Sequence, residues 1–128
     1  MTKNSSLNFT MNKEFNLIKK HDSMHIIMNH NSSNAIDINF LIKFQEIMDK
    51  IPNEIPLSIT GNDRFFSSGL DLSFTQKLNR TKMHQIIHQF EKLLQSILER
   101  SGCTVAIVKG HAVAGGFILA SACDHIYC

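Results

Sequence analysis

Two long stretches of the chain carry apolar residues at the spacing of an α-helix that packs one face against a core. The polar run 31–34 offers turn and N-cap residues, and from about 34 to 51 apolar side chains recur every three or four positions until Pro52 ends the pattern. The second stretch runs from about 81 to 100, and Gly102 follows it as a C-terminal stop. The apolar positions are Phe40, Leu41, Phe44, Ile47, Met48 and Ile51 in the first helix and Met83, Ile86, Ile87, Phe90, Leu93, Leu94, Ile97 and Leu98 in the second.

Shorter apolar runs before and between these helices predict β-strands. Residues 15–20 and 24–29 flank a polar turn, which predicts a hairpin. Residues 57–61 and 104–108 are rich in β-branched side chains and nearly free of charge, as is typical of strands covered on both faces. The order of two strands and a helix, then a strand and a helix, predicts an α/β fold.

Composition fits a single domain and argues against nucleic-acid binding. The chain has 128 residues, of which 43% are hydrophobic, and this is enough for one modest core. Residues 1–12 are polar and low in charge, so we interpret them as an N-terminal tail before a domain at 13–128. The net charge of +2 comes from scattered basic residues, and without a basic cluster we expect no nucleic-acid partner.

The cysteines and the hydropathy pattern predict an intracellular protein. Cys103, Cys123 and Cys128 are an odd number in apolar settings, which favours reduced thiols over a disulfide framework. No apolar segment of secretory type stands near the N-terminus, and no targeting signal is seen. Lys109 interrupts the longest apolar run, 105–123, so we expect no membrane span.

Two histidines have the spacing of a zinc-binding helix. His84 and His88 stand at i and i+4, where the metalloprotease pattern places a glutamate next to the first histidine. Gln85 occupies that position, and the spacing suggests no third ligand. We therefore expect a solvated polar helix face here and no metal site.

Two glycine-bearing turns follow the two buried strands, and the candidate chemistry is concentrated in them. In each turn a strand leads into small residues and glycine. Glycine leaves neighbouring backbone N–H groups open, because no side chain blocks an approaching ligand. Such amides can hold an oxygen that carries negative charge, although each turn alone also fits an ordinary strand-to-helix connection.

The two turns together resemble one family. Their sequences are Phe66-Ser67-Ser68-Gly69-Leu70-Asp71-Leu72 and Val108-Lys109-Gly110-His111-Ala112-Val113-Ala114-Gly115-Gly116-Phe117, the second followed by Ala120-Ser121-Ala122-Cys123-Asp124. In content, order and separation they resemble the two oxyanion motifs of the crotonase family, the enoyl-CoA hydratases and isomerases, and the resemblance extends back through 24–56. It implies a crotonase-like ββα spiral of which this chain carries the N-terminal half, with the C-terminal half absent.

The resemblance also implies a site and its ligand. In that family a backbone N–H after the first glycine and a glycine N–H of the second motif bind the thioester oxygen; by position these are Leu70 and Gly115. The implied partner is an acyl-CoA thioester, with coenzyme A as part of the substrate and no separate cofactor. The implied substrate-binding set is Ser67, Ser68, Gly69, Leu70, Asp71, Ala114, Gly115 and Gly116.

One position favours a particular reaction. Hydratases of the family carry a glutamate three positions beyond the oxyanion glycine, and that position is Ile118 here. An isoleucine cannot deprotonate water, so the chain resembles Δ3,Δ2-enoyl-CoA isomerases more closely; these shift a double bond with a single later carboxylate. An enoyl-CoA hydratase and a dienoyl-CoA isomerase are the alternatives. We expect the remaining acids to be structural, with Asp71 as a helix cap, Asp124 at a helix end, and Glu91 and Glu99 on a polar helix face.

Chains of this family are much longer, so we expect the later carboxylate to lie outside residues 1–128 and this chain alone to be inactive. A homotrimer or hexamer is expected only for a full-length form, in a peroxisome or mitochondrion. A hypothesis of another class is a non-catalytic acyl-CoA binder or assembly partner derived from the enzyme. A dinucleotide-binding module fits poorly, because Gly110, Gly115 and Gly116 do not give the G-x-G-x-x-G spacing.

Overall fold

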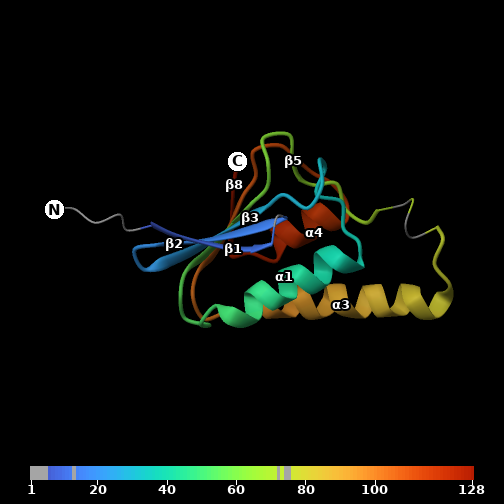
Figure 1. Cartoon of the computed structure of the whole chain (residues 1–128), viewed down its shortest axis with the longest axis horizontal. Helices are drawn as coiled ribbons and strands as arrows, with labels where there is room; N and C mark the ends of the chain where they lie inside the picture. The colour runs from blue at the N-terminus through green and yellow to red at the C-terminus, as the bar shows by residue number, and fades with distance from the viewer. Residues whose placement is uncertain (1–5, 13, 72, 74–75) are drawn as a thin grey trace.

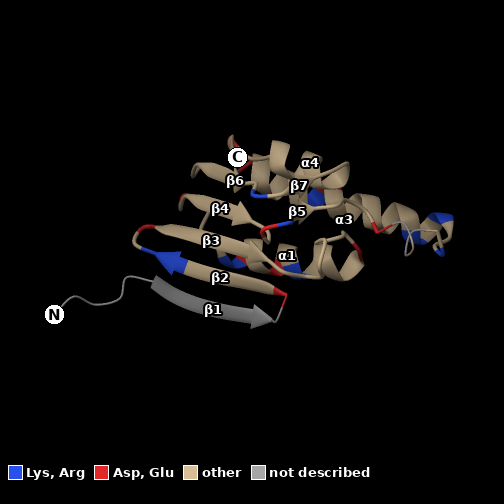
Figure 2. Ribbon diagram, turned by 90° about the horizontal axis from the view of Figure 1, so that it is seen from above, with Lys and Arg blue, Asp and Glu red and all other residues tan. Residues whose placement is uncertain are grey.

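A six-stranded sheet forms the centre of the computed structural model, which describes residues 6–12, 14–71, 73 and 76–128. Its strands are β1 (Ser6–Asn12), β2 (Phe15–Lys20), β3 (Ser23–Met28), β4 (Leu57–Thr60), β6 (Thr104–Ile107) and β8 (His125–Tyr127). They lie side by side in the order β1-β2-β3-β4-β6-β8. Figure 2 shows β2, β3, β4 and β6 following one another in this order. The first three are antiparallel neighbours, and β3, β4, β6 and β8 run parallel to one another.

Two long helices lie next to each other along one face of this sheet (Figure 1). α1 (Ile38–Lys50) begins at the N-cap Asp37, whose carboxylate accepts the Phe40 N–H at 2.8 Å, and α3 (Arg80–Leu98) begins at the N-cap Asn79. Alternate strand residues point to the same face and meet the helices there. Fully buried side chains of this core are Phe15, Ile26, Met28, Leu57 and Ile59 from the strands, Phe40, Leu41, Phe44 and Ile47 from α1, and Leu93 from α3.

A small second sheet joins the segments that follow β4 and β6. β5 (Phe65–Ser67) and β7 (His111–Ala112) pair in parallel, and α4 (Gly115–Ser121) follows β7 and contacts both strands. Because β4 and β6 are parallel neighbours, their carboxyl ends meet at the same edge of the large sheet. The two glycine-bearing turns therefore come together at this edge.

The structure confirms the α/β class, both long helices, the hairpin of β2 and β3, and the strands predicted at 57–61 and 104–108. Two details were wrong. α1 is capped by Asp37 rather than by the run 31–34, and the apolar stripe of α3 is narrower than predicted, because Ile87 and Leu98 are 43% and 65% exposed.

No helix in the described part of the chain combines the length and the apolar character needed to cross a membrane.

Residues 6–12, which the sequence analysis assigned to a polar tail, form β1. Its backbone pairs with β2 from Ser6 opposite Lys20 to Asn12 opposite Phe15. The strand adds a third antiparallel member to the predicted hairpin. Residues 1–5 of the predicted tail lie outside the described part of the chain.

The three cysteine thiols should differ sharply in reactivity. Cys103 and Cys128 are exposed, whereas Cys123 is buried, and burial raises the pKa of the Cys123 thiol to about 12. Since the thiolate is the reactive form, iodoacetamide at pH 8 should alkylate Cys103 and Cys128 in the folded chain and Cys123 only after denaturation. Peptide mass spectrometry before and after denaturant checks this. Alkylation of Cys123 at the rate of the other two thiols would contradict the buried position.

Candidate functional site

Backbone hydrogen bonds join the two glycine-bearing turns. In the β5–β7 pair, Phe65 lies opposite His111 and Ser67 opposite Ala112. The His111 N–H donates to the Arg64 carbonyl at 2.9 Å, and the Val113 N–H donates to the Ser67 carbonyl at 3.0 Å. The structure therefore brings together two segments that are far apart in the sequence.

The first turn is held in shape around Gly69. Gly69 has φ of 88°, a conformation that L-residues rarely adopt. Its carbonyl accepts the Ile36 N–H at 2.7 Å, and the Asp71 N–H donates to the Ile36 carbonyl at 2.9 Å. These two bonds bracket Leu70, whose own N–H has no protein acceptor within the described part of the chain.

Ser67 connects this turn to the segment between β3 and α1. Its side chain is fully buried. The Ser67 hydroxyl donates to the Asn34 carbonyl at 2.8 Å and accepts the Gly69 N–H at 3.1 Å. Ser68 adds a second connection, since its N–H and its hydroxyl donate to the Ser33 carbonyl and hydroxyl at 3.0 and 3.1 Å. Both predicted site serines thus hold the loop in place.

The second turn leads directly into α4. Ala114 is exposed and has φ of 50°, and the next two residues, Gly115 and Gly116, are buried. The Gly116 N–H donates to the Val113 carbonyl at 2.8 Å. Among the hydrogen bonds of the described residues, none uses the Gly115 N–H.

Gly69 and Gly115 are in contact across the junction of the two turns. A Cβ built on Gly69 would lie 3.0 Å from the Gly115 nitrogen, and one built on Gly115 would lie 3.5 Å from the Gly69 Cα. Apolar atoms of Ile36 and Phe90 also lie 3.5 Å from that second Cβ position. The amide of Leu70, the residue after Gly69, and the amide of Gly115 therefore belong to adjoining pieces of backbone beside apolar side chains.

Two of the carboxylates expected to be structural, Asp71 and Asp124, make structural contacts. Asp71 is half-buried and accepts the N–H and the hydroxyl of Ser73 at 3.1 and 2.7 Å, as a capping residue does; the residues needed to describe a following helix lie outside the described ranges. Asp124 accepts the Thr104 N–H at 2.9 Å, and the Thr104 hydroxyl accepts the Asp124 N–H at 2.8 Å. Ile118, at the position where hydratases carry a glutamate, is 50% exposed.

Asn34 and Ile36 shape the site, although the sequence analysis did not identify them as site residues. Asn34 is fully buried with φ of 51°. Its side-chain amide donates to the Met28 carbonyl at 3.1 Å, and its side-chain oxygen accepts the His30 N–H at 2.9 Å. A polar residue that tolerates positive φ, placed in the connection between a strand and a helix, is the sequence signal that could have indicated the role of Asn34.

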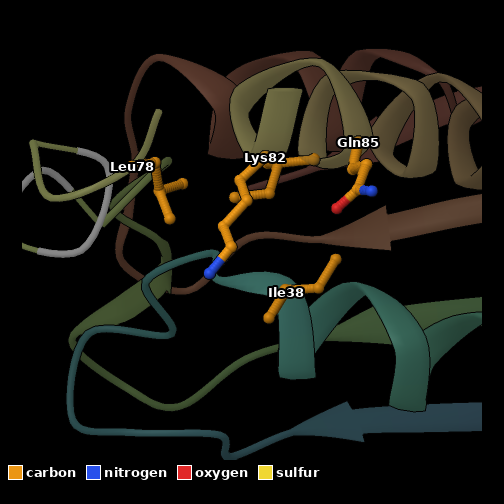
Figure 3. A pocket seen from close by; sticks show the side chains of 5 residues that line it. Ile38, Leu78, Lys82 and Gln85 are labelled. Atoms are coloured by element: carbon orange, nitrogen blue, oxygen red, sulfur yellow. The ribbon is translucent and has the colours of Figure 1, made fainter. Parts of the chain in front are cut away.

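A largely apolar pocket of about 310 Å³ opens between the first turns of α1 and α3. Figure 3 shows Lys82 extending from α3 toward the start of α1. Ile86, in the pocket wall, is one helical turn before Phe90, the residue that lies next to Gly115. The pocket therefore lies on the side of α3 that leads to the two free amides. Its lining residues are Ile38, Leu78, Lys82, Gln85 and Ile86.

Comparison with known proteins assigns the family. The family model described as "Enoyl-CoA hydratase/isomerase" matches residues 20–128. Enoyl-CoA delta isomerase 3 of Arabidopsis thaliana is 34% identical over 74 residues, which are 56% of this chain and 31% of that relative. The peroxisomal Delta(3,5)-Delta(2,4)-dienoyl-CoA isomerase of the same plant is 26% identical over 135 residues, 91% of this chain and 49% of that relative.

Solved structures show the same fold. DspI of Pseudomonas aeruginosa superposes with a TM-score of 0.83 at 24% identity, over 92% of this chain and 50% of that chain. The spiral of strands and helices with its two joined turns thus defines a crotonase fold, of which this chain spans about half. The chain belongs to the enoyl-CoA hydratase/isomerase family.

Substitution by alanine should destabilise the fold much more at Gly116 than at the neighbouring Gly115. A Cβ on Gly116 would lie 2.1 Å from the Ser67 carbonyl oxygen, whereas a Cβ on Gly115 meets its neighbours at ordinary contact distances of 3.5 Å. Gly116→Ala should lower the free energy of unfolding by about 1–3 kcal/mol through overpacking. Gly115→Ala should change it by less than about 1 kcal/mol. Urea denaturation of both variants checks this, and equal losses would mean that the close approach to Ser67 is unimportant.

Proposed function

We propose that the chain binds an acyl-CoA thioester at the junction of the two turns and stabilises the enolate of that thioester. The donors are the backbone N–H groups of Leu70 and Gly115. The observation that carries the proposal is that both amides lack a protein acceptor within the described residues, while Gly69 and Gly115 lie in contact. Two free donors on adjoining backbone can converge on one carbonyl oxygen.

The chemistry of such a pair is electrostatic. When a proton leaves the carbon next to the thioester carbonyl, negative charge moves onto the carbonyl oxygen. A preorganised donor at that oxygen is typically worth about 10²–10³ in rate, or roughly 3–4 kcal/mol. The bonds of Ile36 to Gly69 and Asp71 support preorganisation, because they fix the backbone on both sides of Leu70. The pair lowers the barrier to proton removal, and a separate base must still take the proton.

The pocket beside α3 suits the acyl chain. Its wall is mostly apolar, and Ile86 and Phe90 connect it to the surroundings of Gly115. The pantetheine arm would run past Ser68 and Ala114, which are the half-buried and exposed members of the two turns. Coenzyme A enters as part of the substrate, and the proposal includes no separate cofactor.

Among the reactions of the family, the double-bond shift of an enoyl-CoA isomerase is favoured, as in fatty acid oxidation. The apolar Ile118 supports this choice, and so does the isomerase name of the relatives. Asp71 and Asp124 are engaged with Ser73 and Thr104. We therefore place the proton-transferring carboxylate outside residues 1–128. The peroxisomal name of one relative supports a peroxisomal setting.

Two alternatives remain in the proposal. A dienoyl-CoA isomerase is favoured by the relative of that name, which aligns with 91% of this chain. A non-catalytic acyl-CoA binder is favoured by the exposed apolar side chains of Phe117 and Ile118 on α4, which are 57% and 50% exposed and offer a surface for assembly.

Titration with a 3-oxoacyl-CoA tests the proposal directly, because the enolate of this ligand absorbs in the ultraviolet. The 128-residue chain should raise the enolate band in a saturable way. The matching alkyl-CoA thioether lacks the carbonyl oxygen to which both amides donate. It should raise no enolate band and bind about 10- to 100-fold more weakly, because two hydrogen bonds of roughly 0.5–1.5 kcal/mol each are lost. Equal affinity for the thioether and the thioester would refute the two-amide site.

Gly69→Ala should reduce the enolate band. Its Cβ would lie 2.9 Å from the Val113 carbonyl oxygen and 3.0 Å from the Gly115 nitrogen, so the two turns must move apart. Gly102→Ala is the matched control, since its Cβ would lie 2.6 Å from carbonyl oxygens of Glu54 and Ile55, ahead of the amino ends of β4 and β6. Both variants strain the fold, yet only the Gly69 variant should lose the enolate band at a temperature where both remain folded.

A further inference from the structure

A second group of reactive side chains lies at the opposite ends of the parallel strands. A pocket of about 180 Å³ opens where β3, β4 and β6 begin, whereas the two glycine-bearing turns follow the ends of β4 and β6. His25 pairs with Ser58, and Ser58 with Val105, in the strand register. Their neighbours Met24, Leu57 and Ala106 are buried in the core, so these side chains point to the other face of the sheet. The pocket is lined by Ser23, His25, Pro56, Leu57, Ser58, Cys103 and Val105.

Hydrogen bonds determine which ring nitrogen of neutral His25 carries the proton. The Ser23 hydroxyl donates its one hydrogen to the Lys20 carbonyl at 3.0 Å. Its oxygen must therefore accept from the Nε2 of His25, which lies 3.0 Å away. The Nδ1 atom is then unprotonated, and it lies 2.5 Å from the Ser58 hydroxyl oxygen. The Ser58 hydroxyl consequently donates to Nδ1.

This order of contacts matches a nucleophile, a base and a group that orients the base. In serine hydrolases a carboxylate fixes the tautomer of the histidine, and the other ring nitrogen accepts the serine proton. Here Ser23 fixes the tautomer. Burial lowers the pKa of His25, and Lys20 lowers it further, so the imidazole is the free base at neutral pH. Cys103, from the segment before β6, is the other titratable group in the pocket lining.

We propose that Ser58 is a nucleophilic serine that accepts the acyl group of short acyl thioesters and other activated acyl donors. The Ser58 oxygen bonds to the acyl carbon as its proton moves to Nδ1 of His25. The bond from the acyl carbon to the thiolate or phenolate breaks, and the leaving group takes the proton from His25. The products are an O-acyl serine and a free thiol or phenol.

The surroundings of Ser58 define the scope of this reaction. β4 is an inner strand paired on both sides, so its amides are engaged in the sheet and supply no free donor for an oxyanion at Ser58. The reaction is therefore limited to activated donors and stops after one acyl group per chain. A pocket of about 180 Å³ admits a short acyl group and leaves the rest of the donor outside.

p-Nitrophenyl acetate is a suitable probe. The experiment uses the full chain with the Cys103→Ala and Cys128→Ala changes, because exposed thiols also take acyl groups. We expect a burst of nitrophenol approaching one equivalent, with the acetyl group located on Ser58 by peptide mass spectrometry. Ser58→Ala should abolish the burst. His25→Gln should slow it about 100-fold, as is typical for loss of a general base. Ser101, an exposed serine bonded to the Asn53 carbonyl, is the internal reference for unassisted acetylation.

Two further readouts separate catalysis from a structural role. Ser23→Ala removes the hydroxyl that accepts the Nε2 proton of His25 and leaves Ser58 and His25 themselves in place. It should slow acetylation of Ser58 while the melting temperature stays close to that of the parent chain. The rate should fall as the pH is lowered, with a midpoint below pH 6.5, because burial lowers the pKa of His25 beneath that ordinary value. Acetylation of Ser58 no faster than that of Ser101, or an unchanged rate in folded His25→Gln, would overturn the proposal.

Discussion

The close approach of Gly116 to Ser67 is the constraint on which the candidate site depends. No side chain fits between them, since a Cβ on Gly116 would lie 2.1 Å from the Ser67 carbonyl oxygen. The same carbonyl accepts the Val113 N–H, while the Ser67 hydroxyl joins Asn34 and Gly69. One serine thus ties both glycine-bearing turns to the segment after β3. If this packing were lost, Leu70 and Gly115 would no longer lie on adjoining backbone.

Elements with a local signal could be predicted from the sequence. The helices α1 and α3 repeat their apolar residues over several turns, and the hairpin of β2 and β3 has a polar turn between two apolar runs. β1 carries a signal as well, because Leu7, Phe9 and Met11 alternate with polar residues, although the polar composition of residues 1–12 also fits a tail. β5 and β7 are too short to show any period, and they exist because they pair with each other.

The residues of the candidate site likewise fall into those that the sequence could indicate and those that it could not. The glycines of the two turns were visible in the sequence, since each marks a place where the backbone must be open or tightly packed. The role of Ile36 could not be predicted, and Asn34 offered only the signal of a residue type that tolerates positive φ, because both roles depend on contacts with residues far along the chain. Similarly, nothing in the sequence linked Ser58 to Ser23 and His25, because Ser58 reaches them only through the parallel pairing of β3 with β4.

The contact between Asn34 and Ser67 spans 33 positions of sequence, and the turn before α4 is still further along the chain. Contacts between residues so far apart in the sequence form late in folding, since closing long loops costs conformational entropy before any contact compensates for it. The two free amides can therefore be adjacent only in a chain that has already folded as a whole. The entropic cost of arranging them is met during folding, so a ligand of the proposed site would find the donors ordered and would not spend binding energy on organising them.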